Sequence, residues 1–357
     1  MRLALISDTH AGARGDNPQI NDFFFRFWDN IFFPALEKHR VDKIVHLGDV
    51  VDRRKFINFA IWHKWQTDFF DKLDMMGMPV DMLCGNHDVY YRNTNKVNAL
   101  SELLGRYPNI RIFQEAETVN YGGLDVALVP WINSGNYDST IQFLKDTPAL
   151  TVFGHLEIAG FEMDRGNVCM DGHPRSIFDR FDLVLSGHFH HKSSDGVIYY
   201  LGNQYEITWA DYKDQRGFHI FDTETKQLTF IENPYRLFYK LDYDDSIQNY
   251  EFWKNQDFVP YVNSYVKVVV IRKQNPYLFD TVMDRLYKIG PLDVTIVEDY
   301  TENKLDSITT INQAEDTVTI IRKCVDAMQL PGNVDADKLK SMLQDLYTEA
   351  MNEMAAQ

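Results

Sequence analysis

Residues 183–192, LVLSGHFHHK, place three histidines directly after an apolar run and a glycine. The run has the length and composition of a buried strand, and the glycine permits a sharp turn where that strand ends. His188 and His190 are two positions apart, so in an extended segment their side chains lie on the same face. The spacing therefore predicts that both imidazoles meet one ligand, whose other contacts come from elsewhere in the chain.

Four further polar motifs follow apolar runs in the same way, and they read SDTH, GDVVD, GNHD and GH. In an α/β fold the carboxyl ends of the strands line one crevice, so motifs that are far apart in the sequence can converge there. The first motif repeats the two-residue spacing of the histidine pair. In chain order these motifs supply Asp8, His10, Asp49, Asp52, Asn86, His87, Asp88 and His155.

The donor atoms of this set are carboxylates, imidazoles and one amide, without a thiolate. Such a mixture suits Mn²⁺, Fe or Zn²⁺ in a reactive site, and the share of oxygen favours Mn²⁺, with Mg²⁺ as the alternative. These candidate ligands exceed the needs of one ion but fit two ions that share a carboxylate, the usual clamp for displacement at phosphorus. Each motif alone could be a turn, a helix cap or a core histidine, whereas all five in this order favour a metal site.

Composition narrows the class of protein. The chain has 357 residues and a net charge of −16, which allows two or three domains and excludes nucleic-acid binding through an overall basic surface. Its three cysteines, Cys84, Cys169 and Cys324, form no CxxC pair, so they indicate a reducing compartment and neither a disulfide framework nor a zinc ribbon. No apolar run approaches the roughly 20 residues that cross a bilayer, and we expect a cytoplasmic protein, in the host cytoplasm if it comes from a phage.

Residues 1–230 alternate short apolar runs with amphipathic stretches, the pattern of βα units and of an α/β (α+β) fold. Each polar motif lies just after one of the apolar runs. We expect strands over 2–7, 43–47, 80–84, 124–130, 150–154, 183–187 and 197–202, and helices over 19–39, 57–76 and 95–106.

The rest of the chain changes character. Residues 231–300 read as a compact βαβ unit and predict a small second domain, residues 301–312 read as a polar linker, and residues 313–357 predict two helices. Apolar residues recur at helical spacing in both helices and need a surface to cover, either on their own catalytic domain or on a partner. They are Val318, Ile321, Val325, Met328, Leu339, Met342, Leu343 and Leu346.

The five motifs, in this order, resemble those of the calcineurin-like metallophosphoesterases over about residues 1–225. The resemblance implies a β-sandwich flanked by helices, with a dimetal site at the strand ends. It assigns Asp49 as the ligand shared by both ions, and His87 as the catalytic histidine that stabilises or protonates the leaving oxygen. It also implies that Asp52 and Asp88 orient histidines. One ion would take Asp8, His10, Asp49 and His190, and the other Asp49, Asn86, His155 and His188.

The whole chain is similar to the nuclease subunits of SbcCD-type double-strand-break repair complexes, and especially to their relatives in T-even bacteriophages. The stretches SELLGRYPNI, VPWI and RGFHIFDTET and the terminal helices lie where that family has them. The resemblance implies a double-strand exonuclease and single-strand endonuclease used in DNA recombination and repair, a capping domain, and a terminal hairpin that docks on an ABC-type coiled-coil ATPase. It also implies a homodimer, for which residues 21–33, NDFFFRFWDNIFF, are a candidate surface unless they are core.

Two other features leave alternatives open. Tyr90, Tyr91, Arg92 and Lys96 follow GNHD and suit contacts with unpaired bases and phosphates, although the tyrosines could equally be core. GDVVDRR is close to a motif of Ser/Thr phosphatases in which the arginine holds phosphate, so Arg53 keeps a phosphoprotein or dinucleotide phosphatase as the alternative. His191 is expected at the surface or against a phosphate. A non-catalytic adaptor is a third class, against which the intact ligand set argues.

Overall fold

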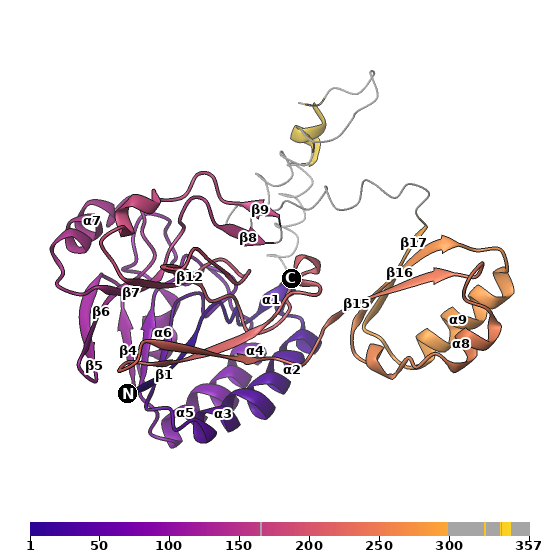
Figure 1. Cartoon of the computed structure of the whole chain (residues 1–357), viewed down its shortest axis with the longest axis horizontal. Helices are drawn as coiled ribbons and strands as arrows, with labels where there is room; N and C mark the ends of the chain where they lie inside the picture. Colours follow the sequence, from indigo (N-terminus) through magenta and orange to yellow (C-terminus); the bar gives the residue numbers. More distant parts are fainter. Residues whose placement is uncertain (165, 299–324, 326–335, 337, 344–357) are drawn as a thin grey trace. The chain divides into compact units, whose positions relative to one another are not determined.

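The computed structural model of the protein describes residues 1–164, 166–298, 325, 336 and 338–343, and it divides the chain into two units, residues 1–298 and 299–357 (Figure 1). In the second unit the described residues are helical; Val325 is buried and Met342 is 57% exposed. The predicted hairpin residues Val318, Ile321, Met328 and Leu346 lie outside the described residues. Within the described part, no helix is both long and apolar enough to span a membrane.

Two six-stranded sheets form the frame of the first unit. The first has the order β14-β13-β1-β2-β3-β4, and the second has the order β11-β12-β10-β7-β6-β5. In the first sheet β1 to β4 run parallel, and antiparallel pairing through β13 and β14 closes one edge. In the second sheet β12, β10, β7 and β6 run parallel, and antiparallel pairing with β11 and β5 closes both edges. The first sheet contains β1 (Arg2–Ile6), β2 (Lys43–His46), β3 (Val80–Leu83), β4 (Ile110–Phe113), β13 (Gly217–Asp222) and β14 (Gln227–Glu232); the second contains β5 (Glu117–Tyr121), β6 (Leu124–Val129), β7 (Thr151–His155), β10 (Leu183–Gly187), β11 (Ser193–Ser194) and β12 (Ile198–Tyr200).

The alternation of side chains along the strands builds two separate cores around the first sheet. In β1, Leu3 and Leu5 pack between the two sheets with residues such as Phe153 and Leu185. Ala4 and Ile6, on the opposite face, pack beneath the helices, as the period of two along a strand requires. This is the β-sandwich flanked by helices that the family resemblance implies.

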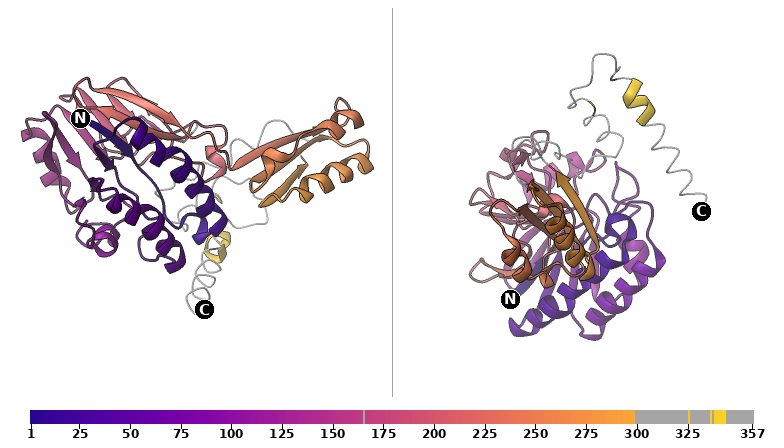
Figure 2. Two further views of the ribbon diagram at one scale, coloured as in Figure 1. Left: turned by 90° about the horizontal axis from the view of Figure 1, so that it is seen from below. Right: turned by 90° about the vertical axis from the view of Figure 1, so that its right-hand side faces the viewer.

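Each of the two long helices expected near the N-terminus is interrupted by a π-helical turn. Residues 28–32 separate α2 (Pro18–Phe27) from α3 (Phe33–Lys38), and residues 66–70 separate α4 (Phe59–Trp65) from α5 (Asp71–Met75). These indigo and purple helices lie side by side in both views of Figure 2.

Most of the aromatic rings that these helices carry are buried. Trp28 meets Trp65 and Phe69 edge to face, with ring centroids 6.0 and 4.8 Å apart, and Phe24 stacks on Tyr205 at 3.6 Å. The aromatic rings of the stretch 21–33 are therefore mostly core in this chain, which is one of the two alternatives that the sequence left open.

Several elements carry no sequence prediction, namely β4, β5, α7 (Tyr137–Asp146) and the short hairpin of β8 (Glu162–Asp164) and β9 (Asn167–Val168). The helix expected over 95–106 is shorter, because α6 spans Ala99–Leu104 and Asn98 caps its start through the amide of Ser101. Asn95, expected inside this helix, is buried and holds the loop by donating to the carbonyls of Gln114 and Trp131.

Beyond residue 234 the chain forms a three-stranded parallel sheet, in the order β15-β16-β17, with its own apolar core. The predicted βαβ unit corresponds to β16, α9 and β17, and a second helix, α8, connects β15 to β16. Parallel neighbours need such crossover helices. The elements are β15 (Phe238–Asp244), α8 (Tyr250–Asn255), β16 (Tyr265–Arg272), α9 (Pro276–Lys288) and β17 (Asp293–Glu298).

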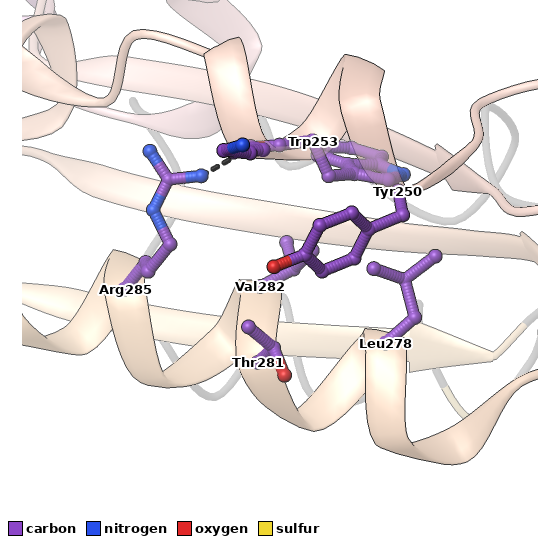
Figure 3. A pocket seen from close by; sticks show the side chains of 7 residues that line it. Tyr250, Trp253, Leu278, Thr281, Val282 and Arg285 are labelled. Carbon is purple, nitrogen blue, oxygen red and sulfur yellow. Dashed lines mark hydrogen bonds between the residues drawn. The ribbon is translucent and has the colours of Figure 1, made fainter.

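A hollow of about 180 Å³ lies between α8 and α9 (Figure 3). Arg285 donates hydrogen bonds to the carbonyls of Trp253 and, at 3.0 Å, Gln256. Its guanidinium therefore satisfies carbonyl groups at the C-terminal end of α8. None of the residues that the sequence marks as metal ligands lines this hollow, whose walls are Tyr250, Trp253, Lys254, Leu278, Thr281, Val282 and Arg285.

Candidate metal centre

The five sequence motifs meet at one edge of the sandwich, where parallel strands of both sheets end. The loops after the strands are joined by hydrogen bonds across the sheets. The ring of His155, at the end of β7, is 2.7 Å from the carbonyl of Leu47 after β2. The backbone amide of His188, after β10, donates to the carboxylate of Asp8 after β1 at 3.1 Å. The predicted convergence of these residues is thus present in the structure.

The backbone at this edge is strained in an unusual way. Four of the candidate ligands have positive φ angles, namely Asp8 at 54°, His10 at 45°, Asp49 at 58° and His188 at 86°. Side-chain-bearing residues rarely adopt this region, and each such residue costs on the order of 1–3 kcal/mol. Hydrogen bonds between loops hold two of them in place, from the amide of Asp8 to Gly48 and from that of His10 to Asp49. The fold therefore positions these side chains at the expense of backbone strain.

Two glycines let the loops approach each other. Gly48 has a φ of 101°, and a Cβ atom there would lie 2.5 Å from Nδ1 of His155. A Cβ atom on Gly85 would lie 2.2 Å from an oxygen of Asp49. Since real Cβ atoms do not come this close to other atoms, only glycine fits at either position. This explains physically why the GD and GN motifs carry a glycine before the polar residue.

One cluster of donor atoms consists of Asp8, His10 and His190, all buried. The Nε2 atoms of His10 and His190 are 3.0 Å apart, and Nε2 of His190 is 4.0 Å from the Asp8 carboxylate. The Nδ1 atom of His190 is buried and has no hydrogen-bond partner among the described residues. Two imidazoles and a carboxylate that converge in this way fit a divalent cation.

A second cluster consists of Asp49, His155 and His188, joined by Asn86. His155 donates from Nδ1 to the Leu47 carbonyl, which directs Nε2 toward the cluster. That Nε2 atom is 2.8 Å from Oδ1 of Asn86 and 3.4 Å from Oδ2 of Asp49. Nδ1 of His188 is 2.9 Å from the same Asn86 oxygen. A carboxylate, an amide oxygen and two imidazoles that converge this closely also fit a divalent metal ion.

Asp49 lies between the two clusters, since its Oδ2 atom is 3.4 Å from His155 and 4.0 Å from His10. Burial would lower the pKa of His10, but the carboxylates of Asp52 and Asp49 outweigh it and raise this pKa to about 9. The pKa of His155 is likewise raised to about 9, because Asp49 outweighs burial. Burial and the neighbouring His155 lower the pKa of His188 to about 3. The site thus stabilises positive charge close to Asp49.

Asp52 and Asp88 support the cluster in different ways. Oδ1 of Asp52 is 3.4 Å from Nδ1 of His10, in agreement with an orienting role. Asp88 instead accepts hydrogen bonds from the backbone amides of Asp49, Val50 and Gly85, each at 2.8 Å, and so ties two ligand-bearing loops together. Burial and the nearby Asp49 raise the pKa of Asp88 to about 7.

His87 is half-buried beside the clusters. Its backbone amide donates to Asp49 at 2.7 Å, and its ring centroid is 4.9 Å from that of His10. Nδ1 of the ring contacts the carbonyl of Asp52 at 2.5 Å, so this nitrogen is the donor and Nε2 is the atom left for a substrate. The geometry suits a proton donor held against the site.

Other predicted residues lie apart from the clusters. Tyr90 and Tyr91 are 41% and 52% exposed, so they are not core, and Arg92 and Lys96 are exposed in the same loop. The Arg53 guanidinium pairs with Asp16. The ring of His191 contacts Asp214 at 2.8 Å and lies 3.4 Å from Glu162.

Sequence reasoning missed Arg216, which is buried and donates to the backbone carbonyl of His190. It also pairs with Asp211 and Asp214 at 2.8 and 2.9 Å. Arg216 begins the RGFH stretch that supports the family resemblance, but an arginine in a loop shows no period that would mark it as buried.

Two donor clusters at the strand ends of a helix-flanked sandwich define a metallophosphoesterase. Residues 1–192, more than half of the chain, match the calcineurin-like phosphoesterase family, and the chain belongs to that family. The chain is 27% identical to exonuclease subunit 1 of Enterobacteria phage T4, over 98% of this chain and 99% of that protein. It is 26% identical to a subunit of the nuclease SbcCD of Staphylococcus saprophyticus, over 61% of this chain and 66% of that protein.

Proposed function

We propose that this chain is a metal-dependent DNA nuclease, the catalytic subunit of an ATPase–nuclease complex in DNA recombination and repair. The observation that carries the proposal is the meeting of two buried donor clusters at Asp49 beside His87. The names of both relatives, an exonuclease subunit and a nuclease subunit, support DNA as the substrate. Double-strand exonuclease and single-strand endonuclease activities are both part of the proposal.

The family and the donor clusters imply a divalent metal cofactor. We propose that the two sites share Asp49 and that Mn²⁺ is the preferred ion, because oxygen and imidazole donors are mixed without a thiolate. When bound, such a pair neutralises charge on a phosphoryl group and lowers the pKa of a water to the neutral range. The proposed ligands are Asp8, His10, Asp49 and His190 for one ion, and Asp49, Asn86, His155 and His188 for the other.

The protein's own residues then orient the substrate and move a proton. His87 presents Nε2 because Nδ1 is held by the Asp52 carbonyl. In the doubly protonated ring the proton on Nε2 can pass to the leaving oxygen of the cleaved strand, which leaves the ring neutral. The hydrogen bond from its backbone amide to Asp49 keeps the ring beside the clusters. The exposed Tyr90 and Tyr91, with Arg92 and Lys96, are proposed to contact the DNA beside the cut.

The arrangement of the whole chain is part of the same proposal. We propose a phosphoesterase domain over 1–230, a capping domain over 231–300, a linker over 301–312 and a helical hairpin over 313–357 that binds an ABC-type coiled-coil ATPase. The near full-length match to a viral subunit supports this division, as do the exposed Met342 and the apolar spacing of the hairpin sequence. A homodimer and action in the host cytoplasm complete the proposal.

The phosphatase alternative rested on Arg53 as a phosphate clamp. Because Asp16 already pairs with that guanidinium, the structure gives this alternative no support.

The test is cleavage of end-labelled duplex DNA and of circular single-stranded DNA by the purified chain in Mn²⁺ or Mg²⁺, beside hydrolysis of p-nitrophenyl phosphate. We expect shortened duplexes and nicked circles in Mn²⁺. A His87→Ala chain, which keeps every proposed ligand, is the control and should lose this cleavage. Turnover of the monoester with both DNAs intact would contradict the proposal and favour a phosphatase.

A further inference from the structure

Two arginines, Arg53 and Arg54, follow the GDVVD motif, and their side chains have different partners. Arg53 is paired with Asp16. Arg54 is half-buried, and its Nη1 atom is fully buried without a hydrogen-bond partner in the described part of the chain. Its guanidinium instead lies near the ring of Trp131, 5.3 Å from the ring centroid. Buried donors are nearly always satisfied, so an unsatisfied cationic donor is a candidate for binding an anionic ligand.

Arg54 stands beside the proton donor of the site. It comes two residues after Asp52, whose carbonyl holds Nδ1 of His87. Trp131, the ring against which Arg54 lies, donates its backbone amide to the carbonyl of Cys84 at 2.8 Å, directly before the GNHD loop. The Asp52 end of the Arg54 loop and Trp131 thus both border the loop that carries His87.

The charges around Arg54 favour an anion. Burial lowers the pKa of this guanidinium, the nearby Arg92 lowers it further, and the attraction of Asp49 opposes both. Lys55, the next residue, lies 5.1 Å from the ring centroid of the exposed Tyr90, which meets Tyr91 edge to face. In a chain with a net charge of −16, this cluster of cationic and exposed aromatic side chains is a surface suited to bind a nucleic-acid strand.

We propose that Arg54 binds a backbone phosphate of the DNA strand next to the scissile one. The inference rests on the proposed function, since that function makes a DNA strand the substrate. Among the described residues Arg54 makes no hydrogen bond to a proposed metal ligand, so the scissile phosphate itself is left to the metal clusters. Arg54 is thus the residue that distinguishes a strand of several phosphates from an isolated phosphodiester.

The first test measures binding of a fluorescent single-stranded oligonucleotide to the full chain in Mn²⁺, from low to moderate salt. All chains carry His87→Ala so that the strand stays intact. We expect Arg54→Ala to reduce the slope of log K against log salt by about 0.7, the loss of one phosphate contact on a single strand. Arg54→Lys should retain most of the slope, and the matched control Arg53→Ala should leave it unchanged.

The second test compares substrates in chains that keep His87. For Arg54→Ala we expect kcat/KM on a DNA strand to fall at least tenfold, while hydrolysis of bis(p-nitrophenyl) phosphate, which has no second phosphate, stays within twofold. An equal loss on both substrates would overturn the inference. An unchanged salt slope, a slope lost in Arg53→Ala instead, or no DNA binding at the lowest salt would also overturn it. If no chain hydrolysed either substrate but the Arg54→Ala slope still fell, the proposed function would fail while the phosphate contact stood.

Discussion

The Nε2 atoms of His10 and His190 face each other at 3.0 Å, although the two residues are 180 positions apart in the chain. Nothing local in either loop creates this contact. It results from the end of β1 and the end of β10 lying at the same edge of the sandwich, where the amide of His188 binds Asp8. The relationship is therefore a property of the fold, and it can be tested through the ions that the pair is proposed to hold.

Metal removal is the simplest test. Binding to the folded chain alone stabilises it by RT ln(1 + [L]/Kd), about 2.7 kcal/mol for one site at a hundredfold excess over Kd. We therefore expect Mn²⁺ to raise the free energy of unfolding, measured by urea denaturation, and EDTA to reverse the gain. Asp49→Asn should lose most of this gain because both proposed sites share Asp49. Equal stability with Mn²⁺ and with EDTA would contradict the two-site interpretation.

Substitution of His87 should separate chemistry from metal binding. His87→Gln removes the proton donor and no proposed ligand, so we expect kcat for DNA cleavage to fall by about 10²–10⁴-fold. Mn²⁺ bound per chain, measured by calorimetry, should not change. A parallel loss of bound metal would show that His87 acts as a ligand.

Gly85→Ala should disturb the shared carboxylate without altering any polar group. The new Cβ atom would lie 2.2 Å from Asp49, so either the carboxylate or the loop must shift, and displacements of about 1 Å cost around 10²-fold in rate. We expect weaker Mn²⁺ binding and slower cleavage. Gly77→Ala is the matched control, because its Cβ atom meets nothing within 4 Å and only its positive φ is strained. Similar activity of both variants would contradict the close-approach argument.

Arg216→Met tests whether Arg216 stabilises the fold and the loop that carries His190. The substitution leaves Asp211 and Asp214 buried without their cation, which costs about 3–5 kcal/mol in the free energy of unfolding. It also releases the His190 carbonyl, so the affinity for Mn²⁺ should fall as well. The exposed pair of Arg111 and Glu117 offers the comparison, since Arg111→Ala should cost about 1 kcal/mol or less. Denaturation and metal titration of both variants measure the two effects.

The parts of the fold and of the site that could be predicted from the sequence are those whose sequence signals lie close together in the chain. The strands before the ligand motifs are short apolar runs, four of the five with a glycine at the turn, and the sequence predicts them to within about two residues because both signals lie within a few positions. The ligand residues could be named for the same reason. β4 and β5 were missed because their residues are partly exposed and alternate weakly.

Contacts between distant segments gave no such signal. The pairing of Arg53 with Asp16 and the burial of Arg216 each depend on a partner that only the folded chain brings near. The aromatic helix at 21–33 was ambiguous because a buried face and a binding face have the same composition. Its role is decided by the rings of Trp65, Phe69 and Tyr205, which come from other elements.

The four ligands with positive φ have a consequence for how the protein matures. Strained backbone of this kind persists only where the surrounding structure dictates it, and here the restraint comes from loops that follow strands of both sheets. In a newly made chain these four side chains would therefore reach their positions only after both sheets have formed.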